Sequence, residues 1–243
     1  MNEELLGLEI VKRGRNYAVK VRGVSEVAGW KRTLGKLVSD RVILDENEGR
    51  AFLEKSGDPV VYEVYNLSKS IPKLIEISER TKVYCDVTVL NYGVISNSGF
   101  GELFLTYGHD HEKPVGEIYS VLAGSGSLVV YKPNGNETVV VRMRAGDDHL
   151  IPPGWIHRFC CGDEGVVLAG FVPHEAGHLY DVVRMKGFPF HLFRDERTGE
   201  VLYRRNPRFE RASLEVTEAK GSFDAVRKYL EKPMELRRMM VSR

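Results

Sequence analysis

The stretch of sequence that decides the fold reads GHDHEKPVGE over residues 108–117, and a second stretch reads PPGWIH over residues 152–157. Together they hold three histidines and several carboxylates. His109 and His111 are separated by one residue, so in an extended segment their side chains point to the same face. Two neutral imidazoles on one face can form the first half of a metal site.

Two further residues can complete that site. Glu117 begins the next expected strand, and His157 follows a Pro-Pro-Gly turn, so both reach the histidine pair if the strands pair across the intervening loop. Three nitrogens and one carboxylate oxygen suit Fe, Mn, Ni, Zn or Co, and four protein ligands leave open positions for a substrate. The alternative is a set of hydrogen-bonded polar residues at a barrel mouth. Gly124, Gly146 and Gly154 stand around the histidines as in the two halves of the cupin motif, and this resemblance favours the metal.

The middle of the chain has the pattern of a compact antiparallel β domain. Short apolar runs alternate with Gly, Pro and Asn turns between residues 58 and 203. Asn-Gly within KPNGN, residues 132–136, predicts a hairpin, and residues 195–199 predict a second one. The eight expected strands suggest a barrel or jelly roll and cover residues 60–67, 82–90, 102–107, 117–123, 127–132, 138–144, 149–151 and 166–172.

The flanking segments differ from this middle region. Residues 1–57 are expected to form an N-terminal arm that packs on the barrel, with a strand over 17–24 and a helix over 46–55. The barrel domain is expected over residues 58–209. Residues 210–243 form a basic tail, in which a helix is expected to open at 222–224 and to be interrupted by Pro233.

Composition excludes several classes of function. The chain has 243 residues, with 35 Lys and Arg against 34 Asp and Glu, so no overall charge attracts nucleic acid or an anionic membrane. Its first residues are acidic where a secretory signal is basic, and no apolar run approaches the roughly 18 residues of a membrane span. We therefore expect a cytoplasmic protein with no membrane or nucleic-acid partner. The three cysteines are expected to be reduced.

The two histidine stretches resemble the cupin superfamily, and a wider set of blocks resembles the cupin-type phosphoglucose isomerases of archaea. These blocks are DPVVYEVY at 58–65, TYGHDH at 106–111, AGHLY at 176–180 and NPR at 206–208. The resemblance implies an all-β, double-stranded β-helix (a jelly-roll barrel) with short helical or extended terminal extensions. It also implies a homodimer that interconverts glucose 6-phosphate and fructose 6-phosphate in glycolysis and gluconeogenesis.

Carried over by residue, the resemblance assigns a role to each matching position. The metal ligands are His109, His111, Glu117 and His157, which would hold one divalent ion per subunit, with iron expected first and nickel, manganese, zinc or cobalt as alternatives. Glu117 and His178 are the expected catalytic residues, with His178 assisting ring opening as a general acid. The expected substrate-binding residues are Tyr62, Thr88, Thr106, Gly108, Tyr119 and Tyr180.

The sequence departs from the family pattern at three places. The loop over residues 112–116 is one residue shorter than in the family, which affects the reach of Glu117. Tyr107 stands where the family has a lysine. Val172 stands where the family has a tyrosine, so one hydroxyl for the substrate phosphate is missing and weaker phosphate binding is expected.

Two other functions remain open from the residues alone. A site of three histidines and one carboxylate also binds oxygen, so a metal-dependent dioxygenase of the same fold is one alternative. A sugar-binding module that does not turn its ligand over is the other. Neither accounts for the blocks around Tyr62 and His178, so the aldose-ketose isomerase is the preferred interpretation. His149 and His174 are expected to be structural.

Overall fold

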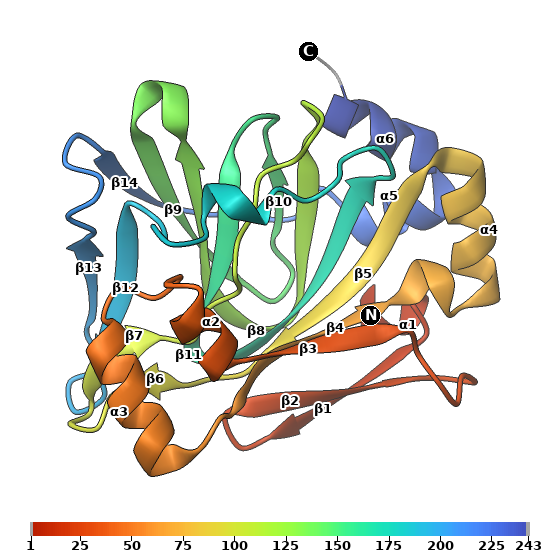
Figure 1. Cartoon of the computed structure of the whole chain (residues 1–243). Helices are drawn as coiled ribbons and strands as arrows, with labels where there is room; N and C mark the ends of the chain where they lie inside the picture. Colours follow the sequence, from red (N-terminus) through yellow and green to blue (C-terminus); the bar gives the residue numbers. More distant parts are fainter. Residues whose placement is uncertain (1, 242–243) are drawn as a thin grey trace.

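A computed structural model describes residues 2–241, which fold around two mostly antiparallel β-sheets (Figure 1). The larger sheet has the order β14-β9-β8-β11-β5-β4-β3, with β10 beside β8, and the smaller has the order β13-β12-β7-β6. The strands of the larger sheet are β3 (Gly29–Thr33), β4 (Val60–Asn66), β5 (Val83–Leu90), β8 (Glu117–Lys132), β9 (Glu137–Arg144), β10 (Asp148–Ile151), β11 (Ile156–Pro173) and β14 (Ser213–Glu218). Those of the smaller are β6 (Val94–Ile95), β7 (Phe100–Leu103), β12 (Phe190–Asp195) and β13 (Val201–Arg205).

Two long strands form the centre of the barrel. β8 and β11 pair antiparallel from Ile156↔Tyr131 to Phe171↔Ile118, and the register shifts twice along the way. Gly124 lies at the first shift with a φ of +78°, and a Cβ there would lie 2.0 Å from the carbonyl oxygen of Gly165. Only glycine fits this approach of the two backbones, which lets the paired strands bend around the barrel.

The larger sheet is covered on both faces. One apolar cluster fills the space between the two sheets, and a second lies between the larger sheet and the elements packed outside it. These outer elements are the hairpin of β1 (Leu8–Arg13) and β2 (Asn16–Val21), the helix α4 (Pro72–Thr81) and the C-terminal helices. Burial on both faces explains why β5 and β11 are rich in Val, Leu and Phe.

The N-terminal segment supplies a strand to the sheet as well as the expected helix. The helix α1 (Asn2–Leu5) precedes the hairpin, and β3 pairs with β4 at the sheet edge. The expected strand over 17–24 is β2, and the expected helix over 46–55 is α3 (Glu46–Ser56), where the side chain of Asp45 accepts a hydrogen bond from the Glu48 N–H at 3.0 Å. The helix α2 (Leu34–Ser39) and β3 were not expected.

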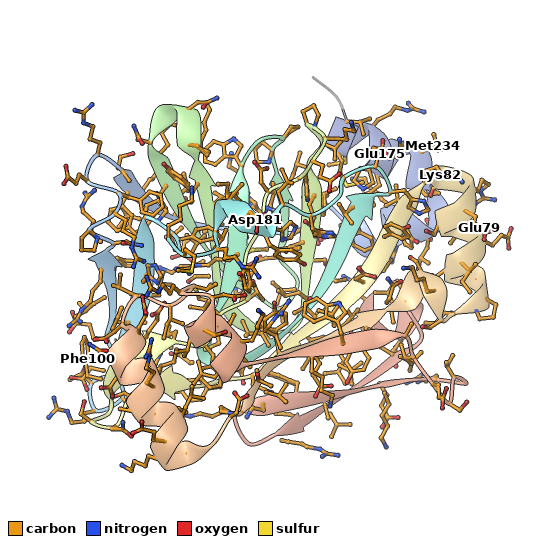
Figure 2. All side chains as sticks on the ribbon, viewed as in Figure 1. Glu79, Lys82, Phe100, Glu175, Asp181 and Met234 are labelled. Carbon is orange, nitrogen blue, oxygen red and sulfur yellow. The ribbon has the colours of Figure 1, made fainter. Side chains whose placement is uncertain are left out.

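The C-terminal segment is tied to the barrel by a strand and two helices. β14 pairs in parallel with β9, which the polar sequence after residue 209 did not predict. The expected helix follows as α5 (Ala225–Glu231), and Pro233 separates it from α6 (Pro233–Val241). Arg237 of α6 donates to the carbonyl of Lys82 at 2.9 Å and to the carboxylate of Glu175. Lys82 and Glu175 lie beside one another in Figure 2.

Most of the expected strands are present, with corrections at four places. The expected strands over 117–123 and 127–132 are one strand, β8, and the expected strand over 166–172 is only the second half of β11. The strand expected over 102–107 ends at Leu103, and α4 lies within the region that was expected to be mostly strand. Both predicted hairpins are confirmed, between β8 and β9 and between β12 and β13. The expected all-β barrel with short helical and extended terminal segments is confirmed.

Two smaller expectations can be compared with the structure. All three cysteines are buried and free, so the expectation of reduced cysteines is confirmed. Within residues 2–241, no helix combines the length and the apolar character needed to cross a membrane.

Tyr229 of α5 provides a test of how far the C-terminal helices stabilise the barrel. Its side chain is fully buried, its ring centroid lies 5.0 Å from that of Phe171, and its hydroxyl donates to the carbonyl of Val83 at 3.3 Å. We expect Tyr229→Ala to lower the free energy of unfolding by about 3–5 kcal/mol through the cavity it leaves. Tyr229→Phe keeps the ring and should cost about 1 kcal/mol. Urea denaturation of both variants measures this, and an unchanged midpoint for the alanine variant would contradict it.

Candidate metal centre and adjoining pocket

Four side chains from three separate segments meet inside the barrel. The Glu117 Oε2 atom lies 2.9 Å from His157 Nε2, 3.3 Å from His111 Nε2 and 3.6 Å from His109 Nε2. One ligand atom from each residue lies within 4.8 Å of every other. The structure therefore brings together the four residues that the sequence suggests, at the mutual distances of a mononuclear metal site.

Backbone pairing places the histidines. His109 and His157 form an isolated bridge in which each N–H donates to the other residue's carbonyl, at 3.1 and 3.0 Å. Gly108 precedes this bridge with a φ of +84°, and a Cβ there would lie 2.6 Å from the Phe188 ring. The glycine therefore lets the chain turn sharply into the extended segment from which His109 and His111 both point inward.

The short loop before Glu117 does not prevent the carboxylate from reaching the histidines. The Glu112 N–H donates to the carbonyl of Ala176 and the Gly116 N–H to that of Met240, both at 2.7 Å. Gly170 leaves room on the other side, because a Cβ there would lie 3.2 Å from Glu117 Oε1. These contacts deliver Glu117 to the centre despite the residue that the loop lacks.

Each of two rings is oriented by a backbone carbonyl. His111 Nδ1 lies 2.8 Å from the carbonyl oxygen of Val115, and His157 Nδ1 lies 3.2 Å from that of Trp155. A proton on each Nδ1 would leave Nε2 with its lone pair directed at the centre of the cluster, as a metal ligand requires.

The electrostatics of the cluster keep Glu117 ionised. Burial acts to raise the pKa of Glu117, but the three histidines around its carboxylate outweigh burial and hold that pKa well below its usual value. Burial and the neighbouring His157 lower the pKa of His109 to about 3. Burial also acts to lower the pKa of His111, but Glu117 outweighs it and raises that pKa. An ionised carboxylate at Glu117 and an unprotonated imidazole at His109 are the donor states that bind a divalent cation.

One buried nitrogen atom of the cluster, His109 Nε2, is suited to bind a metal ion. His109 Nε2 is buried and has no hydrogen-bond partner among the described residues, which is costly for an imidazole nitrogen unless something else binds it. A divalent ion at the centre of the four side chains would bind this atom. The residues therefore fit one metal ion, and the donor set suits Fe, Mn, Ni, Zn or Co.

The cluster opens onto a cavity of about 420 Å³ inside the barrel. Glu117 and His109 form part of its wall, together with His178, whose ring centroid lies 4.5 Å from that of His109. All six residues expected to bind substrate also line it, namely Tyr62, Thr88, Thr106, Gly108, Tyr119 and Tyr180. The structure thus places every expected site residue at one cavity or its metal centre, while their individual roles stay predictions.

Comparison with known proteins identifies the family. The family model for glucose-6-phosphate isomerase (GPI) matches residues 36–207. This chain belongs to the glucose-6-phosphate isomerase family. The glucose-6-phosphate isomerase of Thermococcus litoralis is 32% identical over 196 residues, covering 80% of this chain and 89% of the relative. That of Thermococcus gammatolerans is 36% identical over 202 residues, covering 80% and 97%.

One further relative matches over a similar length, and one solved structure matches more weakly. The glucose-6-phosphate isomerase of Pyrococcus horikoshii is 33% identical over 196 residues, covering 79% of this chain and 96% of the relative. Among solved structures, an oxalate decarboxylase of Bacillus subtilis overlaps 47% of this chain and 26% of its own, with 14% identity and a TM-score of 0.35. That overlap is too small to support a conclusion about function.

The pocket of this family member also contains residues that the sequence did not single out. Arg32 and Trp30 enter from β3, and the Arg32 guanidinium lies 4.9 Å from the Trp30 ring centroid. Asp86 lies on β5, two residues before Thr88, and Lys69 lies at the same wall. Alternation along β5 could have identified Asp86, because residues two apart on a strand share a face. Nothing in the sequence around Arg32 indicates that β3 reaches the pocket.

His174 was expected to be structural, and Tyr107 and Val172 depart from the family pattern. His174 hydrogen-bonds Ser78 at 2.8 Å and stacks on Tyr84, outside the cavity, and the Tyr107 hydroxyl donates to Asp40 at 2.9 Å. Val172 does line the cavity, paired with Tyr84.

Removing His157 tests the four residues of this isomerase-family site as a unit. We expect His157→Ala to lower metal affinity at least tenfold and to lower turnover with it, because it deletes the one ligand contributed by β11. Metal content after dialysis and calorimetric titration with Mn²⁺ or Ni²⁺ measure the affinity. His149→Ala is the matched control, since His149 lies on β10 outside the cluster, and it should bind metal as the parent does. Equal metal content in parent and His157→Ala would contradict the assignment.

Proposed function

We propose that this chain interconverts glucose 6-phosphate and fructose 6-phosphate at one divalent metal ion, as an aldose-ketose isomerase. The observation that carries the proposal is the cluster of three histidines and Glu117, which opens onto a cavity in a chain of the glucose-6-phosphate isomerase family. A bound divalent ion would stabilise the negative charge that develops on the carbonyl and hydroxyl oxygens of the open-chain sugar.

His178 is proposed to assist ring opening. Burial lowers its pKa, so the neutral imidazole predominates near pH 7 and can accept a proton from the anomeric hydroxyl. The ring stacks on Tyr180, with centroids 5.9 Å apart, which orients it within the cavity. This differs from the general acid expected from the sequence, because a ring with a lowered pKa is mostly without the proton that an acid donates.

Glu117 is proposed to act first as a ligand. The three histidines hold its pKa well below the usual value, which makes it a weak base for removing a proton from carbon. Transfer of hydrogen without exchange with solvent is therefore the expected path. Isomerisation in D₂O tests it, because a base-catalysed enediol path would incorporate deuterium into the product.

The phosphate is proposed to bind at the end of the cavity that Arg32 reaches. Arg32 has a buried Nε atom without a hydrogen-bond partner, and it forms no ion pair with any acidic residue of the described chain. Thr88, Thr106 and Tyr180 line the same cavity and supply hydroxyl donors. Charge-assisted hydrogen bonds from such groups are about twice as strong as neutral ones, so they would favour a phosphate.

A coupled assay on glucose 6-phosphate tests the reaction. The apoprotein is loaded separately with Fe²⁺, Mn²⁺, Ni²⁺, Co²⁺ or Zn²⁺, and we expect turnover with at least one ion that is lost on chelation and in His157→Ala. No turnover with any of the five ions would refute the proposal. Oxygen uptake would instead indicate a dioxygenase, and ligand binding without turnover would indicate a binding module. Four points stay predictions: that the native metal is iron, that the protein is a homodimer, that it is cytoplasmic, and that it acts in glycolysis or gluconeogenesis.

Comparing two inhibitors tests the phosphate contacts. We expect 6-phosphogluconate to inhibit far more strongly than gluconate. Thr88→Val should weaken inhibition by 6-phosphogluconate roughly tenfold and leave inhibition by gluconate unchanged, because it removes a charge-assisted hydrogen bond to the phosphate. Thr106→Val should act in the same direction, although its hydroxyl also accepts from the Phe159 N–H at 2.9 Å. Thr138→Val is the matched control, since the Thr138 hydroxyl is buried outside the cavity with no partner in the described chain. Equal inhibition by the two compounds would refute the phosphate site.

A further inference from the structure

Two oxygen atoms in the wall of the cavity lack hydrogen-bond partners. Asn66 at the end of β4 and Asp86 on β5 are paired in register, and both line the cavity. Asn66 Oδ1 and Asp86 Oδ1 are both buried, and neither has a hydrogen-bond partner among the described residues. Directly opposed residues on antiparallel strands point to the same face with their Cβ atoms about 5 Å apart, so the two side chains stand next to each other.

Such a pair of acceptors needs hydrogen-bond donors, which a ligand in the cavity supplies when it displaces water. A buried acceptor that stays unpaired loses its hydrogen bonds to water without compensation, so native structures seldom contain two together. The nearest charges only partly compensate Asp86. Lys69 attracts its negative charge, Glu117 repels it, and Asp86 forms no ion pair within 4.0 Å in residues 2–241.

The pair lies toward the metal centre and away from Arg32. Asp86 pairs with Gly170, and a Cβ at Gly170 would lie 3.2 Å from Glu117 Oε1. Arg32 pairs with Tyr62, which in turn pairs with Leu90, four residues along β5 from Asp86. At about 3.3 Å per residue, the two levels are roughly 13 Å apart along the strand. The cavity thus has the Arg32 guanidinium at one level, and the two unpaired acceptors with Lys69 near them at another.

We propose that Asn66 and Asp86 form a subsite that accepts hydrogen bonds from sugar hydroxyls next to the reacting carbons, first of all the hydroxyl on C3. The inference rests on the proposed function, in which the oxygens on C1 and C2 bind at the metal centre. The C3 hydroxyl is then the next donor along the sugar chain on the side of the cavity where Asp86 stands. Asp86 is therefore a specificity-determining residue for the configuration at C3.

The chemistry of the pair excludes the phosphate as its occupant. A phosphate dianion carries no hydrogen to donate to either oxygen, and Asp86 together with Glu117 repels it. A sugar hydroxyl supplies the hydrogen that each acceptor needs. A carboxylate oxygen accepts from hydroxyls more strongly than a neutral amide does, so most of the discrimination is assigned to Asp86 and less to Asn66.

Two substrates that differ only in configuration at C3 test the subsite. Glucose 6-phosphate and allose 6-phosphate carry the same phosphate and the same oxygens on C1 and C2. We expect the parent enzyme to prefer glucose 6-phosphate by at least tenfold in kcat/KM. Asp86→Ala should lose most of this preference, because kcat/KM falls tenfold or more for glucose 6-phosphate and less than threefold for allose 6-phosphate. Asp86→Asn should keep part of the preference, and Asn66→Ala should lose a smaller part.

Thr88→Val is the matched control on the same strand. Thr88 is the next inward-facing position of β5 and is assigned to the phosphate, which both sugars carry. Its variant should lower kcat/KM for both sugars by the same factor and leave their ratio unchanged. Thermal denaturation and metal content of all variants check that they fold, and Asp86→Asn and Asn66→Ala carry the test if Asp86→Ala does not fold.

The outcomes separate the subsite from the proposed reaction. The subsite is overturned, while the isomerase proposal stands, if the parent enzyme does not prefer glucose 6-phosphate over allose 6-phosphate. It is overturned likewise if the Asp86→Ala variant keeps the parent's preference for glucose 6-phosphate. If the parent turns over neither sugar, the isomerase proposal fails. Calorimetric binding of 6-phosphogluconate and its 3-deoxy analogue then tests the subsite alone. Loss of the 3-hydroxyl should weaken binding about tenfold in the parent and leave it unchanged in Asp86→Ala.

Discussion

The buried carboxylate of Glu117 is the constraint to which the rest of the barrel interior is adapted. Its side chain is 8% exposed, and a charge removed from water to this degree is strongly destabilising unless it is paired. Three imidazoles meet it, and each comes from a position that another feature of the chain has fixed. The backbone bridge between His109 and His157 joins the extended segment to β11, while the loop before Glu117 is held by the carbonyls of Ala176 and Met240. The C-terminal helix α6 therefore contributes to the position of the carboxylate, although it lies outside the barrel.

The metal centre was predictable because its signals are local. Alternation places His109 and His111 on one face, and the turn before His157 marks the beginning of a strand. The resemblance to the cupin motif then joined these three residues in one site. Glu117 followed from its place at the start of β8. The positions of Arg32 and Asp86 depend instead on which strands become neighbours. β3 joins the sheet only through its pairing with β4, and a polar edge strand of five residues carries no alternation strong enough to show this.

The errors in the fold have similar physical causes. The first half of β11 contains Arg158, Cys160 and Cys161, which do not alternate between polar and apolar because both faces of this strand are buried. The Arg158 side chain is fully buried against Phe188, an arrangement that only tertiary packing can create. β14 has the opposite problem, since it is an exposed edge strand whose polar sequence is typical of a loop. In both cases the context of the strand, and not its own propensity, decides the structure.

Two carboxylates in one cavity acquire different properties from their surroundings. The three histidines around Glu117 hold its pKa well below the usual value. Burial and the charge of Glu117 instead raise the pKa of Asp86 to about 7, against the opposing effect of Lys69. Environments that make the pKa values of two such groups differ commonly give the groups separate tasks. A permanently ionised carboxylate suits a cation. The ionised form of Asp86, which is present near neutral pH, accepts hydrogen bonds, which suits a sugar hydroxyl. The same barrel wall thus offers one site for a metal ion and a second for the polyol that the metal ion would act on.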